Sequence, residues 1–232
     1  MQRIFILFLL SIAAARAQTP ESPYLQNAQV GDRRAQYYLA DTLFSAGEYQ
    51  HAEDWATKSS AQGDMDALAL LAQLKISGTV VAFQKAKSLA EQSVELGSKR
   101  GEVILARILT NTQAGKPNYP RAIKLLESAS QDIENDSAVD AQMFLGLIYA
   151  NGVGVAQDNE KATFWFKRSS SLSRSGYAEY WAGMIFLIGE KGFITINKLR
   201  ALQWLNLSCL EGYDTGCETF EQLRAPAEQS RK

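Results

Sequence analysis

Histidine and cysteine are scarce in this chain of 232 residues, which has one histidine, His51, and two cysteines, Cys209 and Cys217. A structural zinc ion takes four ligands, mostly cysteine and histidine, and His51 is distant in sequence from both cysteines. No serine stands in the Gly-x-Ser-x-Gly or Ser-x-x-Lys context of a known nucleophile. The sequence therefore predicts no metal, no cofactor and no catalytic residue, and it places His51 on the surface.

An excess of one charge is lacking as well, since 24 lysines and arginines stand against 25 aspartates and glutamates. Loss of residues 1–17 would remove Arg3 and Arg16 but no acid, which leaves 22 basic and 25 acidic residues and a net charge of −3. A nearly neutral chain without a basic run is not typical of proteins that bind nucleic acid or an acidic membrane surface. We expect neither partner.

Long apolar runs are missing except at the start of the chain, where Ile4 to Ala15 follows the positive Arg3. About 12 apolar residues are fewer than the roughly 20 that cross a bilayer. The Ala15-Arg16-Ala17 sequence fits the small-x-small rule of a secretory cleavage site. We predict a signal peptide over residues 1–17, cleaved after Ala17, in preference to a retained anchor. The mature protein would then be periplasmic or secreted, with no membrane insertion after cleavage.

What the chain does contain is an internal repeat. A small residue opens a short apolar helix pattern six times, at intervals of 32 to 40 residues, without a strand signal between the copies. A repeat of that length predicts a solenoid of helix pairs, and a solenoid usually works by presenting a surface for recognition. The opening residues are Ala35, Ala67, Gly101, Ala141, Ala178 and Gly216.

Each repeat is predicted to contain two helices, which we call helix A and helix B. In helix A, bulky apolar residues four and eight positions after the opening residue share one stripe. Lys75 breaks this pattern in the second repeat, where we expect Leu74 or Ile76 to compensate. In the fifth repeat, where Ala182 stands at the first of these positions, we expect Trp181 to supply the bulk. In three repeats helix B follows a capping residue, at Asn118, Asp158 and Asn197. An alanine comes four residues after each cap, and a large residue predicted to lie in the core follows three residues later. Across the five repeats these large residues are Trp55, Leu89, Leu125, Trp165 and Trp204.

These patterns predict an all-α protein with one solenoid domain over residues 18–223. The repeats are expected at about 31–62, 63–96, 97–136, 137–173 and 174–211, with a half-repeat at 212–223. The last residues, 224–232, are predicted to form a flexible tail.

The fourth repeat, AQMFLGLIYANGVGVAQDNEKATFWFKRSS, resembles the Sel-1-like repeat, a relative of the tetratricopeptide repeat. The resemblance covers about residues 24–223. It implies a right-handed superhelix of antiparallel helix pairs with the A helices on the concave side, and it implies a non-catalytic adaptor or scaffold that binds a protein or peptide. Some relatives are linked to penicillin binding and weak β-lactam hydrolysis. A cell-wall-related or β-lactam-binding enzyme on the same scaffold is therefore the alternative function, although no matching position supports it here.

The two cysteines flank the predicted turn at Gly212, with Cys209 near the end of the last helix B and Cys217 in the first turn of the following helix. In an oxidising compartment such a pair should form a disulfide. The spacing also resembles the bridges of the Helicobacter cysteine-rich proteins, which are secreted Sel-1-like repeat proteins, although here only one junction carries the pair. Two reduced, buried cysteines are the other reading.

Residues two, six and nine positions after the opening residue of helix A fall on the face away from helix B. This face is rich in aromatic and methionine side chains, which suit an adaptable peptide site. Two alternatives remain open, because these side chains could instead pack against neighbouring A helices. A protein that is only a structural spacer is a further possibility. We expect a monomer whose candidate partner-binding residues are Tyr37, Asp41, Phe44, Arg107, Met143, Leu147, Tyr180 and Met184.

Overall fold

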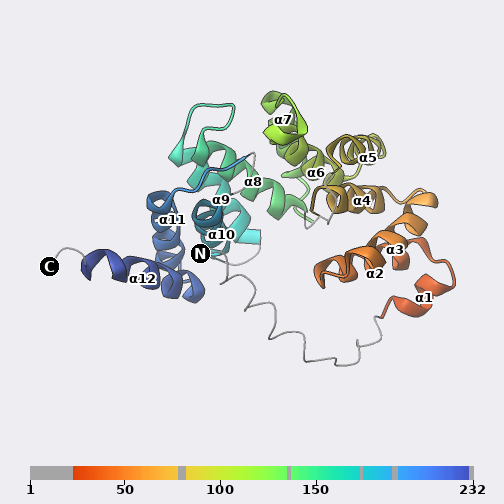
Figure 1. Ribbon diagram of the computed structural model, residues 1–232, viewed down its shortest axis with the longest axis horizontal. Coiled ribbons are helices and arrows are strands. Elements are labelled where there is room, and N and C mark those ends of the chain that lie inside the picture. Colours follow the sequence, from red (N-terminus) through yellow and green to blue (C-terminus); the bar gives the residue numbers. More distant parts are fainter. Residues whose placement is uncertain (1–22, 78–81, 135–136, 173–174, 190–192, 230–232) are drawn as a thin grey trace. The chain divides into compact units, whose positions relative to one another are not determined.

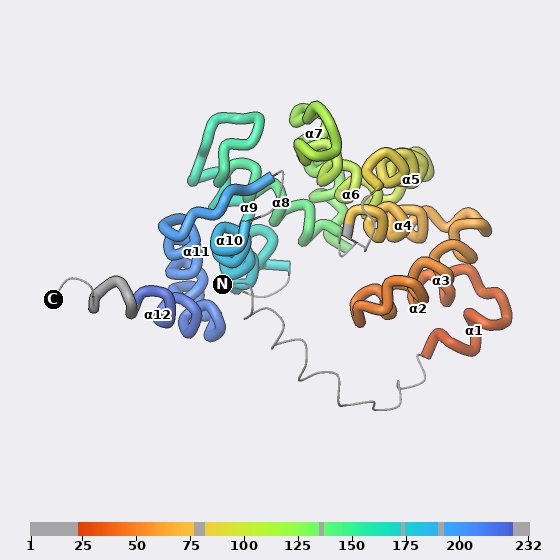
Figure 2. Tube along the Cα trace, in the orientation of Figure 1, coloured from red at the N-terminus to blue at the C-terminus, as the bar shows by residue number. Residues whose placement is uncertain are grey.

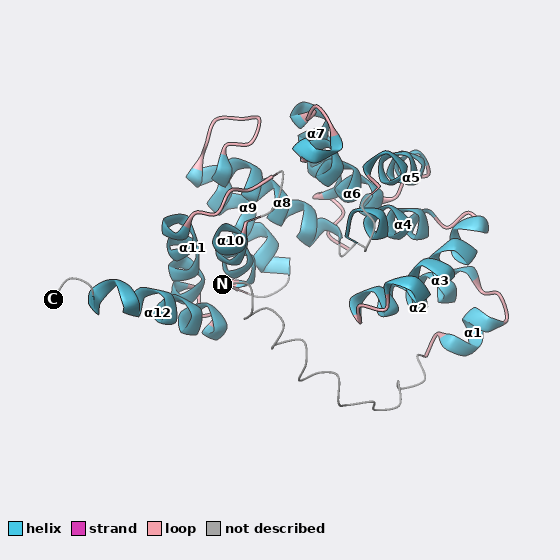
Figure 3. Ribbon diagram, in the orientation of Figure 1, coloured by secondary structure: helices cyan, strands magenta, loops and turns pink. Residues whose placement is uncertain are grey.

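A computed structural model of the protein describes residues 23–77, 82–134, 137–172, 175–189 and 193–229 (Figure 1). Within these ranges the regular elements are twelve α-helices and one turn of 3-10 helix, and none is a β-strand (Figure 3). The predicted all-α class is thereby confirmed. The predicted signal peptide, residues 1–17, lies outside the described residues.

The chain divides into two compact units, one ending at Ala67 and the other beginning at Leu68. The first unit contains the short α1, the pair α2 and α3, and the start of α4. The second contains four helix pairs and α12, so five pairs follow one another along the chain as the repeat predicted. The helices are α1 (Leu25–Gln29), α2 (Arg33–Ser45), α3 (Tyr49–Ala61), α4 (Met65–Ser77), α5 (Phe83–Glu95), α6 (Lys99–Thr110), η1 (Thr112–Ala114), α7 (Tyr119–Ala129), α8 (Ser137–Asn151), α9 (Asn159–Leu172), α10 (Tyr177–Ile188), α11 (Lys198–Leu210) and α12 (Asp214–Gln229).

In the second unit α7, α9 and α11 each pack against two A helices, the one of their own pair and the next along the chain (Figure 2). Thus α9 contacts both α8 and α10, and α11 contacts both α10 and α12. Successive A helices also touch, since α8 contacts α6 and α10. One continuous hydrophobic cluster therefore joins the pairs of this unit, as expected when stacked repeats bury a shared core.

The six opening residues are all buried, which explains why they are small. A Cβ atom on Gly101 would lie 2.4 Å from the Ser93 hydroxyl, and one on Gly216 would lie 2.2 Å from the Ser208 hydroxyl. Real Cβ atoms do not approach other atoms so closely. The small residue therefore allows the start of each helix A to approach the preceding helix B.

One backbone hydrogen bond closes every helix pair. The donor is the backbone N–H of the residue directly before helix B. The acceptor is the carbonyl of the residue eight positions after the opening residue of helix A. This bond is the same in every pair, although the loop between helix A and helix B varies in length. In three of these five residues the side chain caps helix B as predicted, since Asn118, Asp158 and Asn197 accept a first-turn N–H at 3.2, 2.9 and 3.1 Å. The closing bonds are Glu48 to Leu43 (2.9 Å), Ala82 to Lys75 (2.8 Å), Asn118 to Leu109 (2.8 Å), Asp158 to Tyr149 (2.9 Å) and Asn197 to Phe186 (2.7 Å).

The core-facing line of helix B lies one residue beyond the predicted large residues. Trp204 is buried, but Trp55 and Trp165 pack against the core only in part. The fully buried positions are Ala56, Ala90, Leu126, Phe166 and Leu205. In α7, α9 and α11 the reason is that helix B lies between two A helices, so its most buried line faces the seam between them rather than its own partner.

Consecutive repeats are also joined at a second place, between the end of helix B and the first turn of the next helix A. Gln142 donates to the Ser130 carbonyl at 3.0 Å in one junction. At the equivalent place in the last junction, Cys209 and Cys217 form a disulfide with an S–S distance of 2.00 Å, so the predicted bridge is confirmed. At this junction, between α11 and α12, a covalent link takes the place of the hydrogen bond. It is the last junction among the described residues.

The predicted tail overlaps the last helix. The tail was expected from residue 224, and α12 begins at Asp214 and ends at Gln229. Residues 230–232 lie outside the described residues.

Candidate functional site

The candidate residues from the sequence differ in how much surface they offer. Tyr37 and Leu147 are buried, with 7% and 2% of their surface exposed, so they belong to the core. The other six, Asp41, Phe44, Arg107, Met143, Tyr180 and Met184, are half-buried. Packing in the core therefore accounts for Tyr37 and Leu147, whereas the other six keep part of their surface exposed.

In the first unit, Tyr37 is covered by a neighbouring arginine. The Arg34 guanidinium lies 4.8 Å from the centre of the Tyr37 ring and donates to Asp64 and Asp66, both at 3.1 Å. Burial opposes the charge of Arg34, but hydrogen bonds to Tyr38, Asp66 and Asp64 outweigh it and raise the pKa of Arg34. This group is a structural ion cluster that joins the start of α2 to the start of α4.

In the second unit, four aromatic side chains meet at the start of α10, and we call them the aromatic cluster: Tyr177, Tyr180, Trp181 and Tyr213. Tyr180 lies 5.5 Å from Trp181 and 5.4 Å from Tyr213, measured between ring centres. Tyr177 contacts the same two rings at 6.2 and 6.1 Å. Trp181 is 40% exposed and the three tyrosines are half-buried. The cluster thus presents part of four rings on one surface.

Trp181 was expected to fill the core beside Ala182, and this expectation was wrong. Gly183 lets Leu205 of α11 approach so closely that a Cβ on Gly183 would lie 2.6 Å from its Cγ. Phe186 and Leu205 are fully buried and fill the core there instead. Because the core is already filled, Trp181 is left on the outer surface of α10.

Two junction contacts hold the cluster in place. Glu179, fully buried in the first turn of α10, accepts a hydrogen bond from Ser170 of α9 at 2.7 Å. The same Ser170 hydroxyl accepts the Ala178 N–H at 3.2 Å. On the other side, Tyr213 lies within the loop closed by the disulfide. These contacts fix the first turn of α10 and the turn that carries Tyr213.

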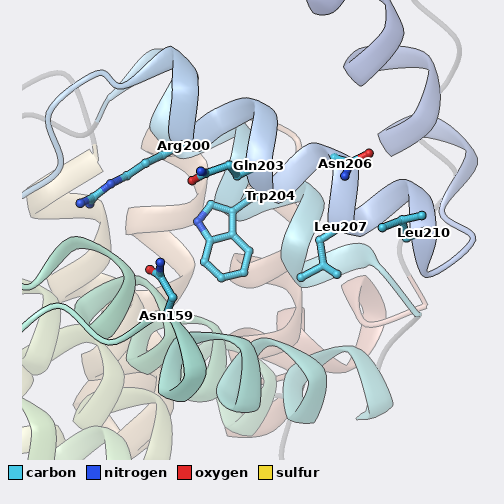
Figure 4. Close-up of a pocket in the computed structure, with 7 residues that line it drawn as sticks. All are labelled: Asn159, Arg200, Gln203, Trp204, Asn206, Leu207 and Leu210. Carbon is cyan, nitrogen blue, oxygen red and sulfur yellow. The ribbon is translucent and has the colours of Figure 1, made fainter.

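A second feature is a pocket of about 310 Å³ between α9 and α11, which the sequence did not predict (Figure 4). Asn159 rises from α9 toward Trp204, and the other labelled side chains line up along α11 from Arg200 to Leu210 (Figure 4). The lining combines one arginine, three amides and three apolar side chains. No histidine, cysteine or carboxylate lines it.

Across the described ranges, no group of three or more histidine, cysteine, aspartate or glutamate side chains is arranged to hold a metal ion. Among the helices of the same ranges, none combines the length and the apolar character needed to cross a bilayer. Asp158 has a lowered pKa, because the backbone N–H of Lys161 and then the Lys161 side chain donate to its carboxylate. That carboxylate acts as a helix cap.

A family model for the Sel1 repeat matches residues 33–64, 112–132, 139–173 and 176–213. The chain belongs to the Sel1 repeat family, whose members are often protein–protein interaction scaffolds and are generally non-catalytic. The resemblance stated from the fourth repeat is confirmed. Residues 65–111 lie outside the matched ranges, yet α4 and α5 are closed by the same backbone bond as the matched repeats.

Two proteins from enteric bacteria are similar over nearly the whole chain. The Sel1-repeat-containing protein YjcO of Escherichia coli (strain K12) is 63% identical over 219 residues, which are 94% of this chain and 96% of that protein. The crystal structure of a sel1 repeat protein from Klebsiella pneumoniae is 62% identical, with a TM-score of 0.85 over 88% of this chain and 99% of that one.

A more distant structure shares the fold alone. It is c5321, described as a protective antigen present in uropathogenic Escherichia coli strains, with 22% identity and a TM-score of 0.55 over 88% of this chain and 44% of that chain. Its fold is that of Sel1-like repeats, a helical solenoid.

Proposed function

We propose that the protein is an exported, non-catalytic scaffold that binds a protein or peptide partner on the surface of its A helices, centred on the aromatic cluster of α10. The observation that carries this proposal is the partial exposure of four rings, each of which contacts two of the others. Tyrosine and tryptophan supply large contact areas at low entropic cost and are enriched among the residues that dominate binding energy. Membership of a family of interaction scaffolds supports the same function.

Export is proposed from two independent features. The first 17 residues have the charge, the apolar run and the cleavage motif of a signal peptide. The Cys209–Cys217 disulfide is of a kind that persists in oxidising compartments. Fractionation of cells that express the full chain should place it outside the cytoplasm with an N-terminus at Gln18. Recovery from the cytoplasm with Met1 intact would contradict export.

Partner binding is tested by site-specific photo-crosslinking in intact cells. A benzoylphenylalanine at Tyr180 should give a discrete adduct, and one at Phe164, an exposed aromatic residue of α9, should give none. The additional change Trp181→Ala should abolish the adduct formed from position 180. Helix content by circular dichroism serves as the folding control. Equal adducts from both positions, or an adduct that survives Trp181→Ala, would contradict this binding surface.

The enzymatic alternative is tested separately with a fluorescent penicillin and a chromogenic cephalosporin. We expect neither specific labelling nor turnover by the purified protein. Labelling that is lost on replacement of a single serine would favour the enzyme.

A further inference from the structure

The pocket between α9 and α11 has a one-sided charge. Arg200 is its only charged lining residue, and Asn159, Gln203 and Asn206 add amide groups. Gln203 and Asn206 are exposed, so their amides are open to a ligand. A positive group beside several donors and acceptors favours an anionic ligand that also carries hydrogen-bonding groups.

Arg200 is held in place by uncharged groups. Its Nη1 donates to the Ala150 carbonyl at 2.8 Å and to Asn151 Oδ1 at 3.4 Å, and its Nη2 donates to Gln157 Oε1. These bonds use three of the five N–H groups of a guanidinium. Among the described residues the two others, Nε–H among them, make no hydrogen bond, and the Phe186 ring centre lies 5.6 Å from the guanidinium carbon. The guanidinium is therefore positioned but its charge is not neutralised.

Equivalent residues in the two preceding repeats are neutralised. Arg121 and Lys161 occupy the place of Arg200, each directly before the alanine of helix B. Arg121 pairs with Glu91 at 3.0 Å, and Lys161 pairs with its capping aspartate at 3.5 Å. Among the described residues, Arg200 has no carboxylate within ion-pair distance. In the last repeat the basic side chain is thus present at this place, but the acidic partner that neutralises it in the two preceding repeats is not.

The same helix differs from its neighbours in a second way. At the positions of Leu207 and Leu210, helices α7 and α9 carry serine, arginine and glutamine side chains. Leu210 is 75% exposed, so it has no core function. Leu207 lies seven residues after Arg200, which is about 10 Å along a helix. Three residues of an extended peptide span about the same distance.

We propose that this pocket binds the C-terminal end of a peptide chain. The terminal carboxylate meets the free edge of Arg200, the amides of Gln203 and Asn206 bind the last peptide groups, and an apolar side chain two or three residues from the end packs on Leu207 and Leu210. This site lies on the B helices and goes beyond the function proposed for the aromatic cluster. A sugar acid fits less well, because Trp204 is 7% exposed, with Phe166 against it at 4.7 Å, and offers no open face for stacking.

The test uses the full mature chain and the fluorescein-labelled hexapeptide GGLLSA with a free carboxyl terminus, followed by fluorescence anisotropy. The peptide should bind saturably, and its C-terminal amide should bind about tenfold more weakly or worse. A third peptide, GGLLSE with an amidated end, carries the acid on a side chain and should bind no better than the amide. N-acetylmuramic acid should not displace the first peptide.

Variants assign the binding to this pocket. Arg200→Gln should remove the difference between the free carboxylate and the amide, whereas Arg121→Gln at the equivalent place in α7 should preserve it. Because Arg200 also holds the loop before α9, the exposed Leu210→Glu provides a second probe, which should weaken binding of the free carboxylate about tenfold through repulsion.

Several results would overturn the proposal. The proposal is wrong if GGLLSA does not bind saturably, or if its C-terminal amide or the amidated GGLLSE peptide binds as tightly as GGLLSA. Displacement of GGLLSA by N-acetylmuramic acid would also contradict it. So would an affinity for GGLLSA that is unchanged in both Arg200→Gln and Leu210→Glu. The crosslinking test uses a different helix and different variants. Failure of the peptide-binding test therefore does not contradict the scaffold function, and failure of the crosslinking test does not contradict the proposed pocket.

Discussion

Replacement of both cysteines by serine, Cys209→Ser with Cys217→Ser, should loosen α12 more than any other helix. The disulfide joins residues eight positions apart. Under the loop-entropy model, closing a loop of that size stabilises the folded state by about 2.5 kcal/mol. α12 packs on α11 and α10, and among the described residues no other helix makes comparable contact with it. The loss should therefore appear as local opening of α12 rather than as unfolding of the whole unit.

Hydrogen exchange measures this directly. A loss of about 2.5 kcal/mol corresponds to a roughly 70-fold faster exchange of amides that open with α12. Amides of α8 and α9, which are separated from α12 by at least two helices in the chain order, should keep their protection. Wild-type protein treated with a reductant should reproduce the variant, which controls for any effect of the serine side chains.

The aromatic cluster should respond to the same change, because Tyr213 lies within the closed loop. In the double variant, Trp181 fluorescence should shift toward that of a solvated indole. Unchanged exchange in α12, or an equal loss of protection in α8, would refute the view that the bridge acts on this last junction alone.

Three other changes test the packing and the caps. Gly146→Ala would place a Cβ 2.3 Å from the Phe166 ring, so it should destabilise the protein by about 1–3 kcal/mol in urea unfolding, and Phe166→Leu should rescue part of the loss. Ser170→Ala removes both buried hydrogen bonds of its hydroxyl and should cost about 2–3 kcal/mol, whereas Ser171→Ala removes an exposed bond and should cost less than about 0.5 kcal/mol. Asp158 has a lowered pKa in the folded state because first-turn N–H groups of α9 bind its carboxylate. Its contribution is therefore complete above the unfolded pKa of about 3.9 and is lost as the pH falls through the folded pKa. Asp158→Asn should remove that acid-side loss, as carboxyl NMR titration and acid unfolding would show. A stable Gly146→Ala, equal effects of the two serine changes, or an unshifted Asp158 titration would each contradict the corresponding argument.

Sequence patterns succeeded where two helices that follow one another in the chain contain all the information. The small opening residues, the caps at Asn118, Asp158 and Asn197, and the cysteine pair all act within one hairpin or across one turn. Their spacing along the chain is fixed by the helix itself, since 3.6 residues make one turn. The family, the helix pairs and the disulfide could therefore be inferred before any coordinates.

Prediction failed where burial depends on a neighbouring repeat. Periodicity identified Trp165 as a core residue, but the residue after it, Phe166, is fully buried. These two positions are separated by about 100° around the helix, and only contact with both flanking A helices selects between them. Trp181 was misplaced for the same reason, because Leu205 from α11 already occupies the space beside Gly183.

The candidate site was found only in part. Tyr180 belonged to the predicted face, but Tyr213 lies in a turn where helical periodicity carries no information. The pocket on α11 could have been suspected by comparing repeats, since Leu207 and Leu210 replace polar residues of the earlier copies. The shape of the pocket could not be predicted from the sequence, because the pocket forms only when α9 and α11 lie beside each other.

Local chemistry thus accounts for what every repeat has in common, which is two helices, a small first residue and one closing backbone bond, and for the side-chain cap on the second helix of three repeats. Those features need interactions between residues that are near in sequence, which the order of amino acids specifies directly. The differences between repeats depend on contacts between separate helices. Which rings remain exposed on α10, and whether Arg200 meets an acid, follow from how the second unit packs, because burial and charge pairing are properties of the neighbours in space.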